Sequence, residues 1–347
     1  MGKRVLITGL ATFWGGLVAK ALEQDPGIDV LVGLDTREPT VELERTEYVR
    51  TDENYSILSR IVRAAKVDTI VHTFLVVDST MMRARTMHEI NVIGTMNLFA
   101  AASQPGSAVR SVVVKSSSYV YGAAKEDPVW FTEETPRSHP PRRRVERSLE
   151  AVEGYVRDFA LDNPHVNVTL LRFSNVLGPD IVTPLSRALE LPLVPKLFGY
   201  DPRFQFVHED DVIRSILFVL ERELPGIYNV AGDGLLPWTE VAHIAGKRTI
   251  PLPPIGATWA AQPLRLFGVE LPDELLDLLR FGRGVDNRRL KAAGFRYHYT
   301  SAGAVQAFVE AVRLRHAVGS TQPTYRYERD VEQFFRHSPA VVREGDP

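Results

Sequence analysis

Apolar runs and helical repeats alternate along the first half of the chain. Six short apolar runs predict strands, at residues 4–9, 29–35, 46–52, 67–74, 110–118 and 167–175. Segments between them carry apolar residues at helical spacing, at residues 15–24, 56–66 and 88–103. Strands that alternate with helices of about ten or more residues are typical of a parallel sheet with helices on both faces. We therefore predict an α/β fold built on a doubly wound parallel sheet.

The pattern changes after about residue 176. Prolines cluster there, at positions 179, 184, 192 and 195, and again at positions 251, 253 and 254. Segments 204–221 and 226–232 interrupt this region and predict a strand, a helix and a strand that return to the sheet. We predict a first domain over residues 1–176, rejoined by 204–232, a smaller lobe over residues 177–203 and 233–316, and a peripheral tail over residues 317–347.

The composition narrows the class of protein. The chain has 347 residues, of which 44% are hydrophobic and 24% are charged, and its formal net charge is −2. This balance gives no electrostatic reason to expect nucleic acid or an anionic membrane, and we interpret Arg142, Arg143 and Arg144 as a solvated loop. No apolar run reaches the ~18 residues of a membrane span, and the start lacks the apolar region of a signal peptide. We expect a soluble cytoplasmic protein.

The sequence contains no pattern of residues that is typical of a metal site. The count of 0 cysteines excludes disulfides and thiolate ligands. The 9 histidines are scattered and form no HExxH pattern. We therefore predict no metal site.

A glycine-rich turn, TGLATFWGG at residues 8–16, joins the first strand to the first helix. In this context such a turn is typical of dinucleotide binding, because glycines let the backbone approach the pyrophosphate and the helix N-terminus presents free N–H groups. The candidate cofactor residues here are Gly9, Thr12, Phe13, Trp14 and Gly15. Thr12 stands where a middle glycine is usual, and its hydroxyl either donates to phosphate or blocks it.

Asp35 ends the second predicted strand, about 20 residues beyond the turn. A carboxylate there accepts hydrogen bonds from both ribose hydroxyls and repels a 2′-phosphate, which favours NAD over NADP. Arg37 could offset this preference, and Asp35 could instead act as a strand-end cap. We predict NAD, with NADP as the alternative, and include Thr36 in the site.

Further motifs follow in a fixed order: NVIGTMNL at 91–98, KSSSYVYG at 115–122, LLRFSNVLGP at 170–179, FVHEDDV at 206–212 and YNVAG at 228–232. Together with the glycine turn, they resemble the extended short-chain dehydrogenase/reductase family, the NAD-dependent nucleotide-sugar epimerases and dehydratases. The resemblance implies a Rossmann-like sheet with a smaller C-terminal substrate lobe. It also implies site roles, for Asp52, Thr73, Asn91 and Ser174 toward the cofactor, Ser117 as the catalytic serine, and Asn175 and Arg203 toward the substrate.

The chain departs from this family at the end of the fourth predicted strand. The family places small residues there, which let the nicotinamide ribose pass close to the strand. This chain has Phe74 and Leu75 instead. A phenyl group adds volume to a close-packed site, so either the cofactor sits differently or its pocket is partly filled.

A second departure affects the chemistry. The family's catalytic Tyr-x-x-x-Lys pair falls on Val145 and Leu149, a register fixed by Glu153, which matches the glutamate four residues beyond the lysine. A serine cannot replace the phenol, because it is a far weaker acid. A literal match, from Tyr121 to Lys125, follows the fifth strand, and we keep Tyr121 with Ser117 as candidate catalytic residues.

Three functional hypotheses follow. The first is a non-catalytic or strongly altered family member that acts by binding or sensing. The second is an active NAD-dependent epimerase, dehydratase or reductase with an atypical acid/base. The third is an interaction subunit without a cofactor. The resemblance further implies a nucleotide-sugar-like ligand and a homodimer formed through the helices at about 83–103 and 145–161.

Overall fold

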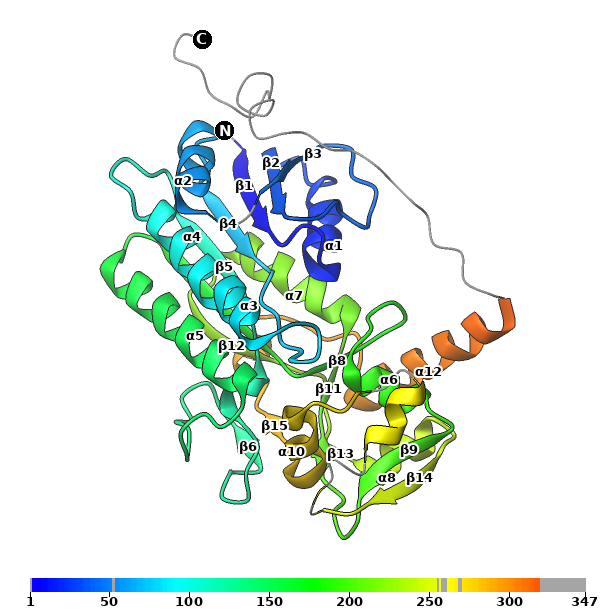
Figure 1. Ribbon diagram of the computed structural model, residues 1–347. Helices are drawn as coiled ribbons and strands as arrows, with labels where there is room; N and C mark the ends of the chain where they lie inside the picture. The colour runs from blue at the N-terminus through cyan, green and yellow to red at the C-terminus, as the bar shows by residue number, and fades with distance from the viewer. Residues whose placement is uncertain (1, 52–53, 255, 257–260, 268–269, 319–347) are drawn as a thin grey trace.

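The computed structural model describes residues 2–51, 54–254, 256, 261–267 and 270–318, and these build a seven-stranded sheet in the order β12-β7-β5-β4-β1-β2-β3 (Figure 1). Its strands are β1 (Lys3–Thr8), β2 (Ile28–Asp35), β3 (Thr46–Arg50), β4 (Thr69–His72), β5 (Ser111–Ser117), β7 (Asn167–Phe173) and β12 (Gly226–Val230). All neighbouring pairs run parallel. The prediction of a doubly wound α/β sheet is confirmed.

Helices cover both faces of this sheet. One face carries α2 (Tyr55–Ala64), α4 (Gly94–Ala102) and α5 (Arg144–Asp162), which share a core with Val112 and Val114 of β5. The other face carries α1 (Phe13–Leu22) and α7 (Glu209–Arg222), which share a core with Val113 of β5. Side chains alternate along a strand, so residues of β5 divide between the two cores.

The segment at 88–103, predicted as one helix, is divided into three pieces. It begins in α3 (Ala84–His88), passes through a π-helical turn, η1 (Glu89–Ile93), and continues as α4. The Asn91 side chain lies in the π turn and bonds both backbone groups of Val76, with Oδ1 and Nδ2 each at 2.8 Å from its partner. Its Nδ2 also donates to Ser148 of α5 at 3.0 Å. These hydrogen bonds hold the loop after β4 against the π-helical turn η1 and helix α5.

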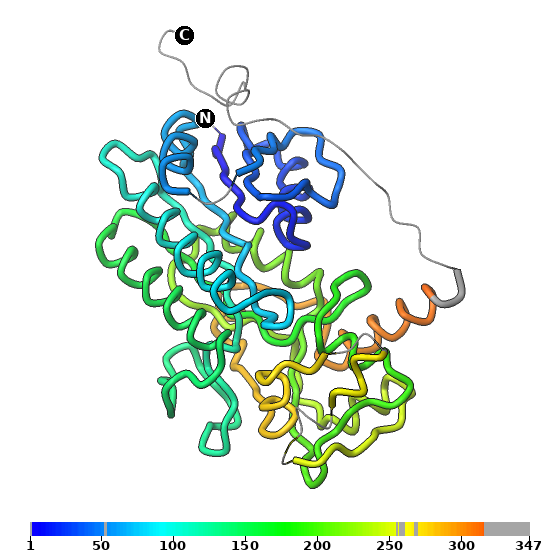
Figure 2. Tube along the Cα trace, in the orientation of Figure 1, coloured from blue at the N-terminus to red at the C-terminus, as the bar shows by residue number. Residues whose placement is uncertain are grey.

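A second part of the chain lies at the opposite end from the N-terminus, in green to orange (Figure 2). It has its own core, which includes Leu197, Phe204, Trp238, Leu275 and Phe308. Its elements are α6 (Pro184–Glu190), β9 (Leu193–Leu197), β10 (Arg203–Phe204), β13 (Leu236–Pro237), α8 (Trp238–Ile244), β14 (Arg248–Leu252), η3 (Gln262–Phe267), α10 (Asp273–Phe281) and α12 (Ser301–Val318).

Short elements join the two parts. They are η2 (Ser118–Tyr121), β6 (Trp130–Phe131), β8 (Asn175–Leu177), β11 (Phe206–His208), β15 (Gly284–Val285) and α11 (Arg288–Ala292). Strand β8 pairs with β11, and β6 pairs with β15, so segments far apart in sequence meet beside the sheet. The predicted site residue Asp52 and positions 319–347 of the predicted tail lie outside the described residues. Within the described part of the chain, no helix combines the length and hydropathy needed to cross a membrane.

Candidate functional site

A cavity of about 710 Å³ opens at the carboxyl ends of the strands. At this edge the strand order reverses between β1 and β4, and open α/β sheets bind ligands at such switch points. Residues of the segment that leads into α6 form part of its wall. The predicted site residues that line it are Thr12, Phe13, Trp14, Asp35, Thr36, Thr73, Ser117, Ser174 and Asn175.

The glycine turn is constrained at both of its predicted glycines. Gly9 has φ of +77°, and a Cβ there would meet Phe74 Cβ at 2.6 Å. A Cβ on Gly15 would stand 2.1 Å from the Gly9 carbonyl oxygen. These positions therefore require glycine, because the turn conformation and the contact between helix and strand leave no room for a side chain.

Thr12 turns its hydroxyl back into the turn. The Thr12 Oγ1 donates to the Gly9 carbonyl at 2.6 Å and accepts from the Gly15 N–H at 3.1 Å. This is an N-cap of α1, which satisfies one of the N–H groups left free at a helix start. The residue that replaces the middle glycine thus stabilises the turn, while the Thr12 side chain remains at the cavity wall.

Asp35 lies at the end of β2 with its carboxylate held in place. The Asp35 Oδ2 accepts from the Ala11 N–H at 3.0 Å, and the Oδ1 accepts from the Arg37 N–H at 3.1 Å. The carboxylate thus ties the end of β2 to the glycine turn. It also faces the cavity, so the cap and the ribose-binding interpretations are compatible.

The phenyl ring of Phe74 does not close the cavity. It packs edge-on against His72, with ring centroids 4.2 Å apart, while the Phe74 backbone and Cβ lie against Gly9. His72 bridges Thr8 at 2.8 Å and Thr95 at 2.9 Å, and burial lowers the pKa of His72 to about 3. His72 is therefore a neutral core residue that orients the wall around Phe74.

Strand β5 brings a lysine and a serine to the cavity. Lys115 is only 5% exposed, and its Nζ lies 5.6 Å from the centroid of the Trp14 ring. Burial lowers the pKa of Lys115 to about 8. Ser117 is also buried, and its Oγ accepts from the Tyr119 N–H at 3.2 Å.

Tyr119 adds a phenol to the same cavity. Burial raises the pKa of Tyr119 above its ordinary value, and the Arg283 guanidinium, 4.6 Å from the ring centroid, only partly opposes this. Lys115 is not among the charges that shift this pKa. A phenol in this environment stays protonated at neutral pH and can donate a hydrogen bond, but it is a poor base.

Helix α5 presents no proton donor where the catalytic pair is expected. Val145 and Leu149 are both 0% exposed and pack in the core shared by α5 and the sheet. Glu153, which set the register, binds Arg172 through an ion pair of 2.6 Å and accepts from Ser116 at 2.7 Å.

Some predicted residues lie away from the cavity wall. The Tyr121 hydroxyl lies 2.8 Å from Asn229 Oδ1 and accepts from Arg172 at 2.8 Å, and the ring stacks on Phe131. Arg203 is exposed on β10. Gly9, Gly15 and Asn91 shape the backbone around the cavity.

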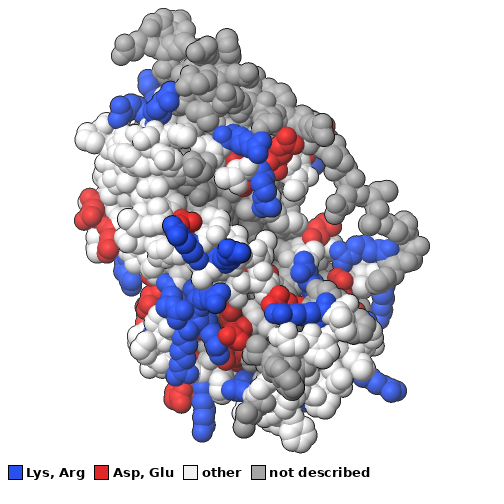
Figure 3. All heavy atoms as spheres, in the orientation of Figure 1, with Lys and Arg blue, Asp and Glu red and all other residues white. Residues whose placement is uncertain are grey.

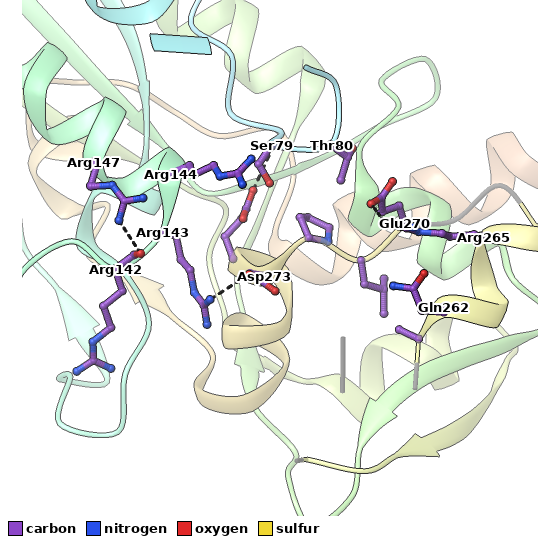
Figure 4. Close-up of a pocket in the computed structure, with 14 residues that line it drawn as sticks. Ser79, Thr80, Arg142, Arg143, Arg144, Arg147, Gln262, Arg265, Glu270 and Asp273 are labelled. Carbon is purple, nitrogen blue, oxygen red and sulfur yellow. Dashed lines mark hydrogen bonds and ion pairs between the residues drawn. The ribbon is translucent and has the colours of Figure 1, made fainter. Parts of the chain in front are cut away.

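A second cavity, of about 320 Å³, is lined by arginines from the start of α5 (Figure 4). Arg143 binds Asp273 and Asp277, at 3.2 Å and 2.5 Å, whereas Arg144 has no partner within the described part of the chain. Basic atoms gather over this region on the face shown in Figure 3, with acidic atoms beside them. Glu274 lines both cavities, and its carboxylate accepts from the Ser79 N–H at 3.2 Å.

Comparison with known proteins identifies the lineage. Residues 5–231 match the model of the NAD dependent epimerase/dehydratase family. The chain belongs to this family. An uncharacterized protein of Mycobacterium tuberculosis is 35% identical over 321 residues, which cover 90% of this chain and 84% of that protein. The dTDP-D-glucose 4,6-dehydratase of Mus musculus is 28% identical over 247 residues, 66% of this chain and 68% of that protein.

Solved structures of epimerases and dehydratases share the fold. MoeE5, in complex with UDP-glucose and NAD, aligns with a TM-score of 0.67 and 21% identity over 90% of this chain and 99% of that chain. The UDP-glucose 4-epimerase of Thermotoga maritima, with UDP-glucose, aligns with a TM-score of 0.68 and 18% identity over 90% of this chain and 99% of that chain. The resemblance drawn from the motifs is therefore confirmed.

Two cavity residues of this epimerase/dehydratase family member escaped the sequence prediction. Lys115 and Tyr119 flank the catalytic-serine position within KSSSYVYG. The sequence did contain a signal for Lys115, because a charged residue is rare within an apolar strand that is buried on both faces. Among the described residues, no group of three or more potential His, Asp or Glu ligands could hold a metal ion.

Proposed function

We propose that this protein binds a nicotinamide dinucleotide and a nucleotide-sugar-like molecule in the large cavity, without proton transfer by α5. The observation that carries the proposal is the complete burial of Val145 and Leu149 beside an otherwise well-formed cavity. An aliphatic pair cannot exchange protons with a sugar hydroxyl. The role that remains is binding or sensing.

The cavity walls fit a dinucleotide. The N-terminus of α1 offers backbone N–H groups to a pyrophosphate, and Asp35 offers a carboxylate to a ribose. The Ser174 hydroxyl is buried without a hydrogen-bond partner within the described residues, and it lines this cavity. A buried hydroxyl without a hydrogen-bond partner lowers the stability of the protein unless a ligand supplies that partner. Asp35 favours NAD over NADP.

The second ligand would occupy the side of the cavity that faces the smaller part of the chain. Asn175 and residues 180–185 line that side. Solved relatives of the same fold hold UDP-glucose, which motivates a nucleotide sugar here. We propose that residues 1–176 with 204–232 hold the dinucleotide and that residues 177–203 and 233–316 hold the sugar nucleotide.

Turnover with an atypical acid/base is a second candidate, because Tyr119 and Lys115 place a phenol and an amine in the cavity. The raised pKa of Tyr119 argues against it as a base. Incubation of the protein with NAD⁺ and UDP-glucose or dTDP-glucose, followed by product analysis, decides between the candidates. Conversion that disappears in both Ser117→Ala and Tyr119→Phe would overturn the binding role.

Calorimetric titration tests the binding proposal directly. We expect wild-type protein to bind NAD⁺, and Asp35→Ala to bind it about tenfold or more weakly, because charged hydrogen bonds to the ribose are lost. Asp158→Ala removes an exposed carboxylate from α5 and should leave binding unchanged. Absence of heat with NAD⁺, NADH and NADP⁺ would instead favour a cofactor-free interaction subunit.

A further inference from the structure

Lys115 is a buried cation without a counter-charge. It lies on the face of β5 that α1 and α7 cover, since Val113, two residues earlier, belongs to that core. Its side chain lines the large cavity beside Trp14. Within the described residues, its ammonium has neither a hydrogen-bond acceptor nor an ion-pair partner.

Several charged and titratable groups lie around Lys115 or line the same cavity, but none of them forms an ion pair with its ammonium within the described residues. They are His72 on β4, Glu209 and Asp211 on α7, Arg172 on β7, and Asp35, Arg37, Asp78, Asp180 and Glu274 at the cavity. Glu209 binds the backbone amides of Asp180 and Ile181, and burial raises the pKa of Glu209 to about 7. Asp211 pairs with Arg214, and Arg172 pairs with Glu153. His72 is neutral above strongly acidic pH.

The lining of the cavity places Lys115 between the start of α1, where its Nζ lies 5.6 Å from the Trp14 ring centroid, and the wall formed by the later strands. Asp35 at the end of β2 marks the adenosine ribose, and the start of α1 marks the pyrophosphate. The remaining part of the cavity, which would receive the second half of the dinucleotide, lies at the ends of β4, β5 and β7. Lys115, Ser117 and Ser174 form the wall there.

The two redox states of a nicotinamide dinucleotide differ in this half by one charge. The oxidised ring is cationic, whereas the reduced ring is neutral. We propose that the Lys115 ammonium makes the cavity select the reduced dinucleotide over the oxidised one, so that the protein responds to the redox state of the cofactor. This inference rests on the proposed dinucleotide binding.

The low dielectric of a buried site makes the selection substantial. One unit charge at about 10 Å in a medium of effective dielectric about 20 changes affinity by roughly tenfold. Because burial already lowers the pKa of Lys115 to about 8, the ammonium loses its proton at mildly alkaline pH. The preference for the reduced form therefore holds near neutral pH and fades as pH rises.

Calorimetric titration of the full chain with NADH, NAD⁺ and ADP-ribose tests the inference. We expect wild type to prefer NADH to NAD⁺ by about tenfold near pH 7 and less near pH 9.5. Lys115→Met keeps the length of the side chain and removes its charge, and the preference should shrink toward unity at both pH values. Lys20→Met, at an exposed position on α1, should behave like wild type.

ADP-ribose, which lacks the nicotinamide, separates the possible outcomes. If Lys115→Met loses the NADH preference, the inference stands, whatever change in affinity NADH, NAD⁺ and ADP-ribose share through their common pyrophosphate. An unchanged NADH preference in Lys115→Met overturns it, and so does an equal loss of affinity for all three ligands, which would mark a phosphate anchor. If wild type binds none of the three, the proposed function fails as well.

Discussion

At the scale of single residues, Thr12 shows how a substitution in a binding motif becomes a structural contact. Its hydroxyl donates to Gly9 and accepts from Gly15, so one side chain caps α1 and braces the turn. A glycine at this position would leave both groups to other partners. If the proposed pyrophosphate site is occupied, the steric cost of the Thr12 Cβ beside it is offset by the more rigid turn.

Replacing this cap should weaken the fold measurably. We expect Thr12→Ala to lower stability by about 1 kcal/mol, because the Gly15 N–H loses its acceptor. Thr12→Ser retains the hydroxyl and should remain within about 0.5 kcal/mol of wild type. Urea denaturation followed by circular dichroism measures both, and equal stability of the alanine and serine variants would contradict the role of the cap.

Burial of the Lys115 ammonium lowers the stability of the ligand-free protein by an amount that depends on pH. Its folded pKa of about 8 lies below its ordinary value of 10.5, so between these values the unfolded state binds more protons and stability rises with pH. The cost is full below about pH 8 and disappears above about pH 10.5. We therefore expect Lys115→Met to stabilise the protein near pH 7, by at most about 3 kcal/mol, and to lose that advantage near pH 10.5. A gain in Tm that is the same at both pH values would contradict this account.

At the scale of elements, a buried polar network fixes α5 to the sheet. Glu153 of α5 binds Ser116 of β5 and Arg172 of β7, and Arg172 in turn contacts the Tyr121 hydroxyl of η2. Tyr121 reaches Asn229 of β12. The network therefore spans five elements and explains why Tyr121, although it begins a literal Tyr-x-x-x-Lys match, is engaged in structure.

Breaking this network from one side should be severe. Glu153→Leu leaves Arg172 buried without its carboxylate, and loss of one partner of a buried pair costs about 3–5 kcal/mol. The double variant Glu153→Leu, Arg172→Leu should be less destabilised than Glu153→Leu alone. Glu150→Leu on the exposed face of the same helix serves as the control. Denaturant midpoints compare the four proteins, and a double variant at least as destabilised as Glu153→Leu alone would argue against a coupled pair.

At the scale of the whole molecule, the outer layer formed by α4 and α5 exposes apolar side chains. Ile93 and Met96 are 40% and 36% exposed on η1 and α4, and Tyr155 and Leu161 are 38% and 75% exposed on α5. Figure 1 shows the two helices side by side on one face of the sheet. Exposed apolar side chains on two neighbouring helices are compatible with a protein partner, and the predicted homodimer through these helices would bury them.

A charge at this surface should separate the subunits. We expect wild-type protein to be dimeric in light scattering, and Met96→Glu with Tyr155→Glu to weaken the dimer by at least about tenfold. Phe198→Glu, on a 70% exposed side chain in the smaller part of the chain, is the matched control. A monomeric wild type, or a dimer unaffected by both charges, would contradict the predicted interface.

The sheet and the glycine turn could be predicted from residues that are close together in the sequence. The features that could not be predicted depend on contacts between distant segments. Gly9 and Gly15 follow from the turn itself, whereas the inward direction of the Thr12 hydroxyl depends on the folded loop. The π turn around Asn91 arises from its bonds to Val76 and Ser148, which helical spacing does not reveal. Lys115 could not be assigned to the site from the sequence, because the apolar pattern of β5 predicts a buried strand but not that its one charged residue lines a cavity.

The position of β12 has a consequence for synthesis on the ribosome. This strand pairs with β7 at the edge of the sheet, yet it is encoded after α6, β9 and α7. The edge of β7 therefore stays unpaired until about 60 further residues have been translated, an interval of several seconds at about 5–20 residues per second. A nascent chain with an open strand edge is prone to mispairing, so slow codons between these strands should lower the yield of native protein.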